Sequence, residues 1–205
     1  MTEDDARAWI EERYEPARVA LLDDFAALLT VESDQQNLVA PSTLPTLWSR
    51  HLLDSAQLLN LVPSGWTRWV DIGAGAGLPG IVIAILSDRP VTLIEPRRLR
   101  VEFMLQCINS LGLDKVEVFQ AKAQSANPTS AAHIVSARAV AKLGALFEMS
   151  RGFTSRNTVF VLPKGESAQS EVADARRSWQ GTFHVKQSIV DPKSGIVIAS
   201  GVAPR

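Results

Sequence analysis

The segment from Trp69 to Gly80 constrains the fold of this chain more than any other part of the sequence. A short apolar run carries Asp71, a turn with four glycines follows, and an apolar run over residues 81–86 comes next. Glycine lets the backbone adopt positive φ and lets a ligand approach closely, and a following helix directs its free N–H groups at that ligand. A strand, a glycine turn and a helix in this order predict the nucleotide site of an open α/β sheet.

The glycine turn fits two kinds of nucleotide site. Residues 75–80 match the G-x-G-x-x-G fingerprint of NAD-binding folds, and Glu95 follows 20 residues after the first glycine of that match, as a ribose carboxylate would. The same segment also reads Asp-x-Gly-x-Gly-x-Gly, which resembles motif I of the class I methyltransferases that bind S-adenosylmethionine. Two features favour this second interpretation. Leu78 stands where a fingerprint counted from Gly73 needs its third glycine, and Asp71 would repel a pyrophosphate.

Beyond the turn, short apolar runs alternate with helix-length segments. The runs predicted as strands are residues 68–72, 91–95, 116–119, 134–137 and 158–162, and the predicted helices are 78–86, 97–111, 142–150 and 166–179. This alternation predicts parallel βαβ units. Two further runs, 182–190 and 196–202, are joined by a turn-rich loop and predict an antiparallel hairpin. We therefore expect an α/β fold of the class I methyltransferase type, a Rossmann-like, mostly parallel seven-stranded sheet that ends in a hairpin.

The first 65 residues have a helical pattern. Apolar side chains between Val19 and Leu29 recur at spacings of three and four, and a second helical stretch is predicted from Leu44 to Leu61. A Pro-Ser-Gly segment at 63–65 ends it. We expect a helical N-terminal cap over residues 1–65 that packs on a methyltransferase domain over residues 66–205 as one compact unit.

Composition narrows the possible partners. The net charge of −1 gives no general basic field for nucleic acid, although a local patch can be offset by acids elsewhere. Cys107 is the only cysteine and the three histidines are scattered, so neither an internal disulfide nor a metal site is predicted. The acidic N-terminus lacks the apolar segment of a signal peptide, and no apolar run approaches the ~20 residues that span a bilayer. We expect a cytoplasmic monomer with no membrane contact.

Charged residues follow the ends of three predicted strands, where ligands bind in such sheets. Glu95 can accept hydrogen bonds from both ribose hydroxyls of an adenosine. Arg138 and Lys164 follow the fourth and fifth strands, and a place in the site is favoured over a structural ion pair for each. The arginines of residues 97–100 form either a solvated helix face or a phosphate-binding patch.

Five segments match one bacterial family in order and spacing. They are Asn37-Leu38, Arg50-His51-Leu52-Leu53-Asp54-Ser55, residues 71–80, Ser136-Ala137-Arg138-Ala139 and Lys164-Gly165. From about Asn37 to beyond Lys164 the chain resembles the small-subunit ribosomal RNA guanine-N7 methyltransferases, also called glucose-inhibited division protein B. The resemblance implies methyl transfer from S-adenosylmethionine to N7 of a guanine in 16S ribosomal RNA of the small subunit, guanine 527 in the family.

The resemblance and the glycine turn together imply the site residues. The predicted cofactor-binding residues are Asp71, Gly73, Gly75, Gly77, Leu78, Glu95, Ala123, Gln124 and Arg138. Asn37, Arg138 and Lys164 fall where the family has polar site residues and are predicted to orient the guanine; Lys122 is a further such position. Residues 121–124 depart from the family's usual arginine and glutamate, and Glu95-Pro96 replaces aspartate-serine. An NAD-dependent dehydrogenase and a non-catalytic nucleotide- or RNA-binding module are the alternatives.

Overall fold

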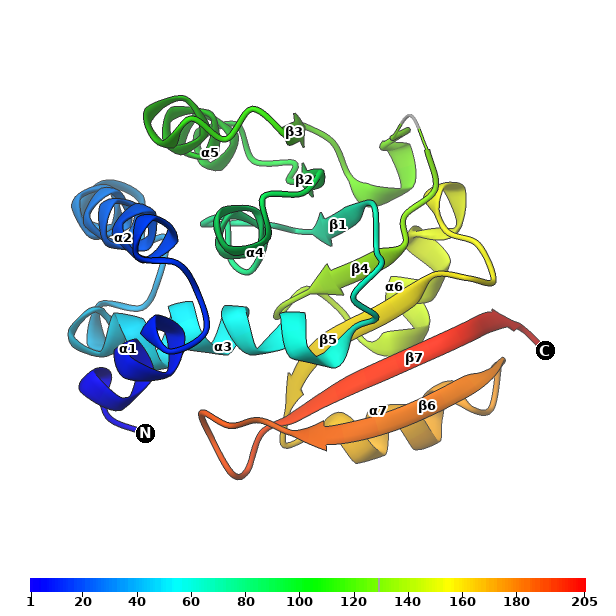
Figure 1. Ribbon diagram of the computed structural model, residues 1–205. Coiled ribbons are helices and arrows are strands. Elements are labelled where there is room, and N and C mark those ends of the chain that lie inside the picture. The colour runs from blue at the N-terminus through cyan, green and yellow to red at the C-terminus, as the bar shows by residue number, and fades with distance from the viewer. Residues whose placement is uncertain (129) are drawn as a thin grey trace.

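The computed structural model describes residues 1–128 and 130–205 and contains one seven-stranded sheet in the order β3-β2-β1-β4-β5-β7-β6 (Figure 1). The strands are β1 (Trp69–Ile72), β2 (Val91–Ile94), β3 (Val116–Phe119), β4 (Ile134–Ala137), β5 (Val159–Gly165), β6 (Trp179–Gln187) and β7 (Gly195–Pro204). Strands β1 to β5 pair in parallel, whereas β7 is antiparallel to both β5 and β6. The predicted fold class is therefore confirmed.

Helices cover both faces of the sheet (Figure 1). On one face lie α4 (Gly80–Ser87) and α5 (Arg98–Leu111), and on the other lie α6 (Leu143–Met149) and α7 (Ala168–Ala175). Successive strand side chains point to opposite faces, so Trp69 belongs to the core under α4 while Val70 belongs to the core under α6. Burial on both faces explains why the strand sequences are almost continuously apolar.

The N-terminal helices pack on the α4 face. Helix α1 (Glu3–Glu11) precedes α2 (Pro16–Gln36), which lies beside α4 and α5 (Figure 1). The fully buried side chains of Leu22, Phe25 and Leu29 belong to the same apolar cluster as the α4 side chains. Helix α2 therefore packs on the same apolar core that covers this face of the sheet.

The helix predicted from Leu44 to Leu61 is divided into four short pieces. They are η1 (Pro41–Thr46), a π-helical turn η2 (Trp48–Leu53), α3 (Asp54–Ala56) and η3 (Gln57–Leu61). Pro45 lies inside the first piece and has no N–H to donate, which interrupts an α-helical ladder. The Glu3 carboxylate accepts hydrogen bonds from Trp48 N and Ser49 N at 2.9 and 2.8 Å, so a new helix start is capped from α1.

The hairpin begins earlier than predicted. Helix α7 ends at Ala175, and β6 starts at Trp179 instead of Thr182. The Trp179 ring packs edge-on against Phe147 with centroids 5.4 Å apart, so a tertiary contact recruits this residue into the strand. A register shift between Gln180 and Thr182 then accommodates the extra residues.

Gln57 joins the N-terminal segment to the hairpin. Its side chain is buried, its Nε2 donates to Ser188 Oγ at 3.1 Å, and its Oε1 accepts from Ile189 N at 3.0 Å. Residues from the two ends of the sequence therefore share one hydrogen-bond network beside the sheet.

The strand order reverses next to β1, which lies between β2 and β4. Open α/β sheets bind ligands at the carboxyl ends of the strands at such a reversal. The residues that follow β1, β2 and β4 are therefore the place to look for a site. None of the helices in residues 1–128 and 130–205 combines the length and apolarity needed to cross a lipid bilayer.

Candidate active site

Glycines in the left-handed backbone region build the turn after β1. Gly73, Gly75 and Gly77 have φ angles of 65°, 57° and 81°, which residues with a Cβ rarely adopt. The N–H groups of Gly73 and Ala74 donate to Ile94 O at 2.8 and 3.1 Å and tie the turn to the end of β2. A Cβ added to Gly73 would lie 2.6 Å from Val140 Cγ2, so both the backbone angle and the space favour glycine here.

Asp71 lies beneath this turn and lines neither of the two cavities described below. Its side chain points to the α4 face, where Oδ2 accepts from Gly80 N at 3.0 Å and Oδ1 accepts from Ser136 Oγ at 2.7 Å. Ser136 Oγ in turn accepts from Trp69 Nε1 at 2.7 Å. Complete burial raises the pKa of Asp71 to about 7, although both hydrogen bonds favour the charged form. The carboxylate thus fixes the start of α4 and, through it, the turn.

Asp71→Asn is expected to remove a pH dependence of stability. The folded pKa of about 7 lies above the ordinary aspartate pKa of 3.8, so between these pH values the folded chain holds a proton that the unfolded chain has lost. The contribution of Asp71 to stability is therefore present below about pH 4 and is lost as the pH rises through about 7. Urea unfolding from about pH 4 to about pH 8 measures this. The free energy of unfolding of wild type minus that of the variant should fall with rising pH, and a constant difference would contradict the assignment.

Glu95 connects the turn to the residues that follow β2. Its side chain is buried, with Oε2 accepting from Gly75 N at 3.0 Å and Oε1 accepting from Arg97 N at 2.9 Å. A carboxylate has about four acceptor sites, so two hydrogen bonds leave capacity for hydroxyl groups of a ligand. Glu95 therefore shapes the site and remains able to accept from a bound molecule.

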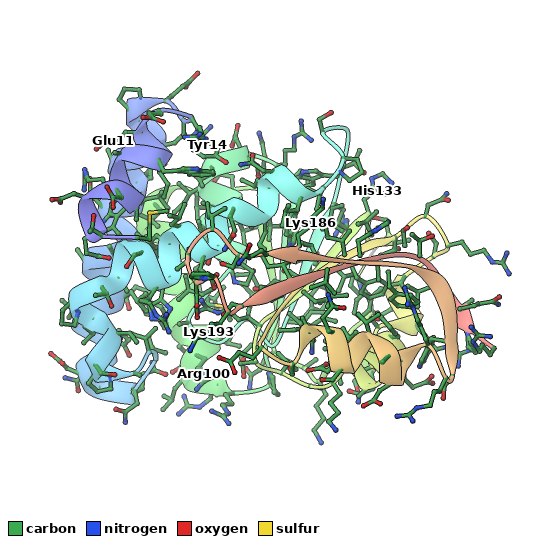
Figure 2. The ribbon with its side chains drawn as sticks, turned by 90° about the horizontal axis from the view of Figure 1, so that it is seen from below. Glu11, Tyr14, Arg100, His133, Lys186 and Lys193 are labelled. Carbon is green, nitrogen blue, oxygen red and sulfur yellow. The ribbon has the colours of Figure 1, made fainter. Side chains whose placement is uncertain are left out.

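A cavity of about 400 Å³ opens above the turn, and we call it the glycine-loop cavity. Its walls are Leu38, residues 73–76, Leu78, residues 95–97, Arg100 and residues 138–140. Arg100, labelled in Figure 2, lies on the first turn of α5. Of the predicted cofactor residues, the cavity brings together Gly73, Gly75, Leu78, Glu95 and Arg138.

The arginines at the start of α5 are not equivalent. Arg98 forms an exposed ion pair with Glu102 and is a solvated residue of the helix face. Arg97 and Arg100 line the glycine-loop cavity, and neither guanidinium is bonded to any residue in the described part of the chain. Two unpaired guanidinium groups at the wall of a cavity favour an anionic ligand group. Of the two interpretations of this segment, the solvated face thus fits Arg98, and an anion-binding patch fits Arg97 and Arg100.

A second cavity of about 490 Å³ lies at the ends of β4 and β5, and we call it the Lys164 cavity. Its walls are Asp54, residues 138–142, residues 163–165, Ser167, Glu171, Ser188 and residues 194–196. The Lys164 ammonium donates to Ala141 O and pairs with Glu171 Oε2 at 3.1 Å. Residues 138–140 line both cavities, so the two spaces meet at one wall.

Arg138 stands at this shared wall and pairs with Asp54. Arg138 Nη1 lies 3.4 Å from Asp54 Oδ2, while Asp54 Oδ1 accepts from Gln57 Nε2 at 2.9 Å. Burial raises the pKa of Asp54, and the neighbouring Arg138 acts in the opposite direction. The predicted position of Arg138 beside a ligand space and its pairing in an ion pair are therefore both present in the structure.

Besides Asp71, four predicted site residues lie outside both cavity walls. Gly77 is in the turn, where a Cβ would collide with Ile81, and Asn37 is an exposed left-handed residue that ends α2. Ala123 and Gln124 form the short helix η4 (Ala123–Ser125) beyond β3. Sequence reasoning gave no role to Asp54, although it belongs to the quoted Arg-His-x-x-Asp segment, and it missed Glu171, which carries no motif.

His51 lies on the π-helical turn beside this region. Thr43 Oγ1 donates to Ala40 O, so it accepts from His51 Nε2 at 2.8 Å, which leaves Nδ1 buried and without a partner in the described chain. Burial and the nearby charges of Arg138 and Arg50 lower the pKa of His51 to about 4. The residue is thus neutral and packed. Across the described ranges, no three acidic, histidine or cysteine residues cluster as metal ligands would.

A protein-family comparison identifies the chain. The model of the family described as "rRNA small subunit methyltransferase G" matches residues 18–196. The chain is 43% identical over 204 residues to the protein named ribosomal RNA small subunit methyltransferase G of Sphingopyxis alaskensis, covering 98% of this chain and 87% of that protein. It is 42% identical over 208 residues to the protein of that name from Rhizorhabdus wittichii, covering 100% and 95%.

Solved structures share the fold at low sequence identity. A methyltransferase from Geobacter sulfurreducens aligns with a TM-score of 0.60 at 16% identity, over 86% of this chain and 90% of that one. A SAM-dependent methyltransferase from Aquifex aeolicus aligns with a TM-score of 0.59 at 15% identity, over 82% and 96%. The family match covers most of the chain, and the relatives match almost all of it. The chain therefore belongs to the rRNA small subunit methyltransferase G family of S-adenosylmethionine-dependent enzymes.

Proposed function

We propose that this enzyme transfers the methyl group of S-adenosylmethionine to N7 of one guanine in 16S ribosomal RNA, at the position corresponding to guanine 527 of the family. One observation carries the proposal: the glycine-loop cavity and the Lys164 cavity meet at a wall formed by residues 138–140. A cofactor held in the first cavity and a base held in the second would then be neighbours, because both would contact residues 138–140. Such an arrangement supplies proximity and orientation, the main requirement of a methyl transfer.

The glycine-loop cavity suits the cofactor on the chemistry of its walls. Glu95 keeps acceptor sites for ribose hydroxyls, and Arg97, Arg100 and Arg138 offer donors to the carboxylate of the amino-acid part. Positive φ at Gly73 brings the turn close to the ligand space. Asp71 and Gly77 support the turn from beneath and within. Ala123 and Gln124 stay predictions from the resemblance.

Guanine N7 needs little chemical assistance. It is an sp² acceptor whose lone pair is free at neutral pH, so no proton must leave before it forms the new N–C bond. When bound, the cofactor supplies an activated methyl group on a sulfonium, and the electrons of the broken S–C bond return to sulfur. The product base is cationic. The Lys164 ammonium is paired with Glu171, which limits the net positive charge that the cavity presents to this product.

The acceptor base must be unstacked or lie in a loop, because the deep major groove of an RNA duplex hides N7. Exposed cations beside the Lys164 cavity can receive the flanking phosphates. Lys142 lines this cavity, and Lys193, labelled in Figure 2, lies on the loop between β6 and β7. We propose that the enzyme uses this local patch, works as a monomer in the cytoplasm, and combines a cap of residues 1–65 with a catalytic domain of residues 66–205. Asn37, which ends α2 within that cap, stays a predicted contact of the guanine.

Lys164→Ala is expected to reduce methyl transfer about tenfold or more while the Kd of S-adenosylmethionine changes less than about twofold. Lys164 lines only the second cavity, and charged hydrogen bonds contribute about 1.5–3 kcal/mol. Transfer of labelled methyl groups to small ribosomal subunits and calorimetric cofactor binding measure the two effects. Lys115→Ala, which removes an exposed lysine paired with Asp88, is the control. Wild-type transfer by the Lys164 variant would remove Lys164 from the site.

The proposed reaction is tested by mapping methylated guanines in the small-subunit RNA of cells with and without this protein. One guanine should lose its N7 methyl group in the deletion and regain it on complementation. Absence of any change would overturn the proposal and favour the non-catalytic RNA-binding module. Membership of a methyltransferase family argues against the dehydrogenase alternative. As a direct check, S-adenosylmethionine at 100 times its Kd should stabilise the protein by about 2.7 kcal/mol, whereas NAD should not.

A further inference from the structure

Two partly buried carboxylates, Asp54 and Glu171, line the Lys164 cavity, and their hydrogen bonds differ. Glu171 is fully engaged: Oε2 accepts from Leu143 N at 3.0 Å and pairs with Lys164, and Oε1 accepts from Ser167 Oγ at 2.9 Å. Only one oxygen of Asp54 has a short hydrogen bond. Its Oδ1 accepts from Gln57 Nε2, whereas its Oδ2 faces Arg138 at 3.4 Å.

The Arg138–Asp54 pair therefore keeps unused hydrogen-bonding capacity. Charge-assisted N–H···O bonds are normally about 2.7–2.9 Å long, so 3.4 Å leaves the pair loosely closed. Arg138 has five N–H donors, and the described chain engages one of them. Both side chains line the cavity, and each is 21% exposed. A strong donor and a strong acceptor thus stand next to each other, open to a ligand.

This order of donor and acceptor is complementary to one purine. In guanine the O6 acceptor is adjacent to the N1–H donor, whereas in adenine an amino donor is adjacent to the N1 acceptor. Arg138 would donate to O6 and Asp54 would accept from N1–H. With adenine, both contacts would set donor against donor or acceptor against acceptor, which buried sites reject strongly.

The positions along the cavity agree with this orientation. Arg138 lines both cavities, whereas Asp54 lines only the Lys164 cavity. Around the edge of guanine, N7, O6 and N1 follow in that order. With N7 at the shared wall, O6 would therefore come next, beside Arg138, and N1–H would lie deeper, beside Asp54.

We propose that the Arg138–Asp54 pair reads O6 and N1–H of the target base and makes Asp54 a specificity residue for guanine. This inference rests on the proposed N7 methylation. Gln57 fixes which oxygen of Asp54 is available to the base. Gln57 Oε1 accepts from Ile189 N, and this orients the Nε2 donor toward Asp54. Asp54 Oδ1 must accept from that donor, which leaves Oδ2 as the atom that faces Arg138 and the base.

Asp54→Asn is therefore an informative change. The amide oxygen is required at Gln57, so the amide NH₂ takes the place of Oδ2 and presents a donor where guanine N1–H needs an acceptor. The natural comparison for guanine is 2-aminopurine, which keeps N7 and the 2-amino group but lacks O6 and has an acceptor at N1. The ratio of methyl transfer to these two bases reports only the contacts assigned to Arg138 and Asp54.

The experiment uses small subunits reconstituted with RNA that carries guanine or 2-aminopurine at the methylated position. Wild type should prefer guanine about 100-fold or more, and Asp54→Asn should reduce this preference at least tenfold, with the Kd of S-adenosylmethionine within about threefold of wild type. Glu171→Gln, at the other partly buried carboxylate of the cavity, is the matched control. It should lower transfer to both bases alike and leave their ratio unchanged.

The outcomes separate the two proposals. If wild type methylates guanine but Asp54→Asn keeps the wild-type ratio, the specificity role is wrong and the proposed function stands. An equal loss on both bases assigns Asp54 a structural role only, and also overturns the inference. If wild type with bound S-adenosylmethionine transfers no methyl group to guanine, the proposed function fails, and this inference fails with it.

Discussion

Gly73→Val is expected to weaken binding of S-adenosylmethionine at least about 100-fold while the protein stays folded. A left-handed backbone angle costs a residue with a Cβ about 1–2 kcal/mol, and more when the side chain is β-branched. At Gly73 the φ angle is 65°, and an added Cβ would also lie 2.6 Å from Val140 Cγ2. A combined cost near 3 kcal/mol corresponds to about 100-fold in affinity. Calorimetric titration with the cofactor measures the loss.

A matched control separates this effect from general damage to the protein. Gly65 precedes the first strand, and an added Cβ there would have no atom within 4 Å. Gly65→Val should therefore bind the cofactor as wild type does. Gly73→Val with Val140→Ala should recover only part of the loss, because the clash is relieved while the backbone strain remains. Wild-type cofactor affinity in a folded Gly73→Val protein would show that the turn does not form the cofactor site.

Arg138→Ala is expected to weaken both cofactor binding and methyl transfer, the latter by about 100-fold or more. Arg138 lines both cavities, so its loss removes donors from each, and it leaves the partly buried Asp54 without its counter-charge. Loss of charged hydrogen bonds on two ligands at about 1.5–3 kcal/mol each accounts for this size. Cofactor Kd and single-turnover transfer to small subunits measure the two effects separately.

Arg98→Ala is the control for Arg138→Ala. Arg98 is an exposed arginine at the start of α5 and pairs with Glu102 on the helix surface, where ion pairs contribute little. The Arg98→Ala variant should bind S-adenosylmethionine with a Kd within about twofold of wild type. Normal cofactor binding by Arg138→Ala would assign Arg138 to the acceptor side alone. Normal transfer would remove it from the active site.

The local sequence pattern was enough to predict the fold and those candidate site residues that line the glycine-loop cavity. The glycine turn, Glu95 and Arg138 each follow the end of a strand, and parallel strands bring their carboxyl ends to one edge. These residues therefore line one cavity, the glycine-loop cavity, while their predicted role in cofactor binding stays a prediction. Nothing beyond strand order was needed, because each residue is placed by the strand that it follows.

The remainder of the site depends on long-range packing. Asp54 reaches the Lys164 cavity because Gln57 is bonded to Ser188, 131 residues further along the chain. No local pattern encodes that contact. Asp71 shows a second limit: strand alternation allows a side chain to face the helices instead of the ligand, and its partner Ser136 comes from the neighbouring strand.

The order β5-β7-β6 has a consequence for how the walls of the two cavities are completed. Strand β7 inserts between β5 and β6, although it is made after both. The glycine turn is surrounded by β1, β2 and β4, whereas residues 194–196 of the Lys164 cavity lie at the start of β7. The wall of the Lys164 cavity is therefore complete only when the last strand has joined the sheet, whereas the wall of the glycine-loop cavity comes from residues 38–140 alone.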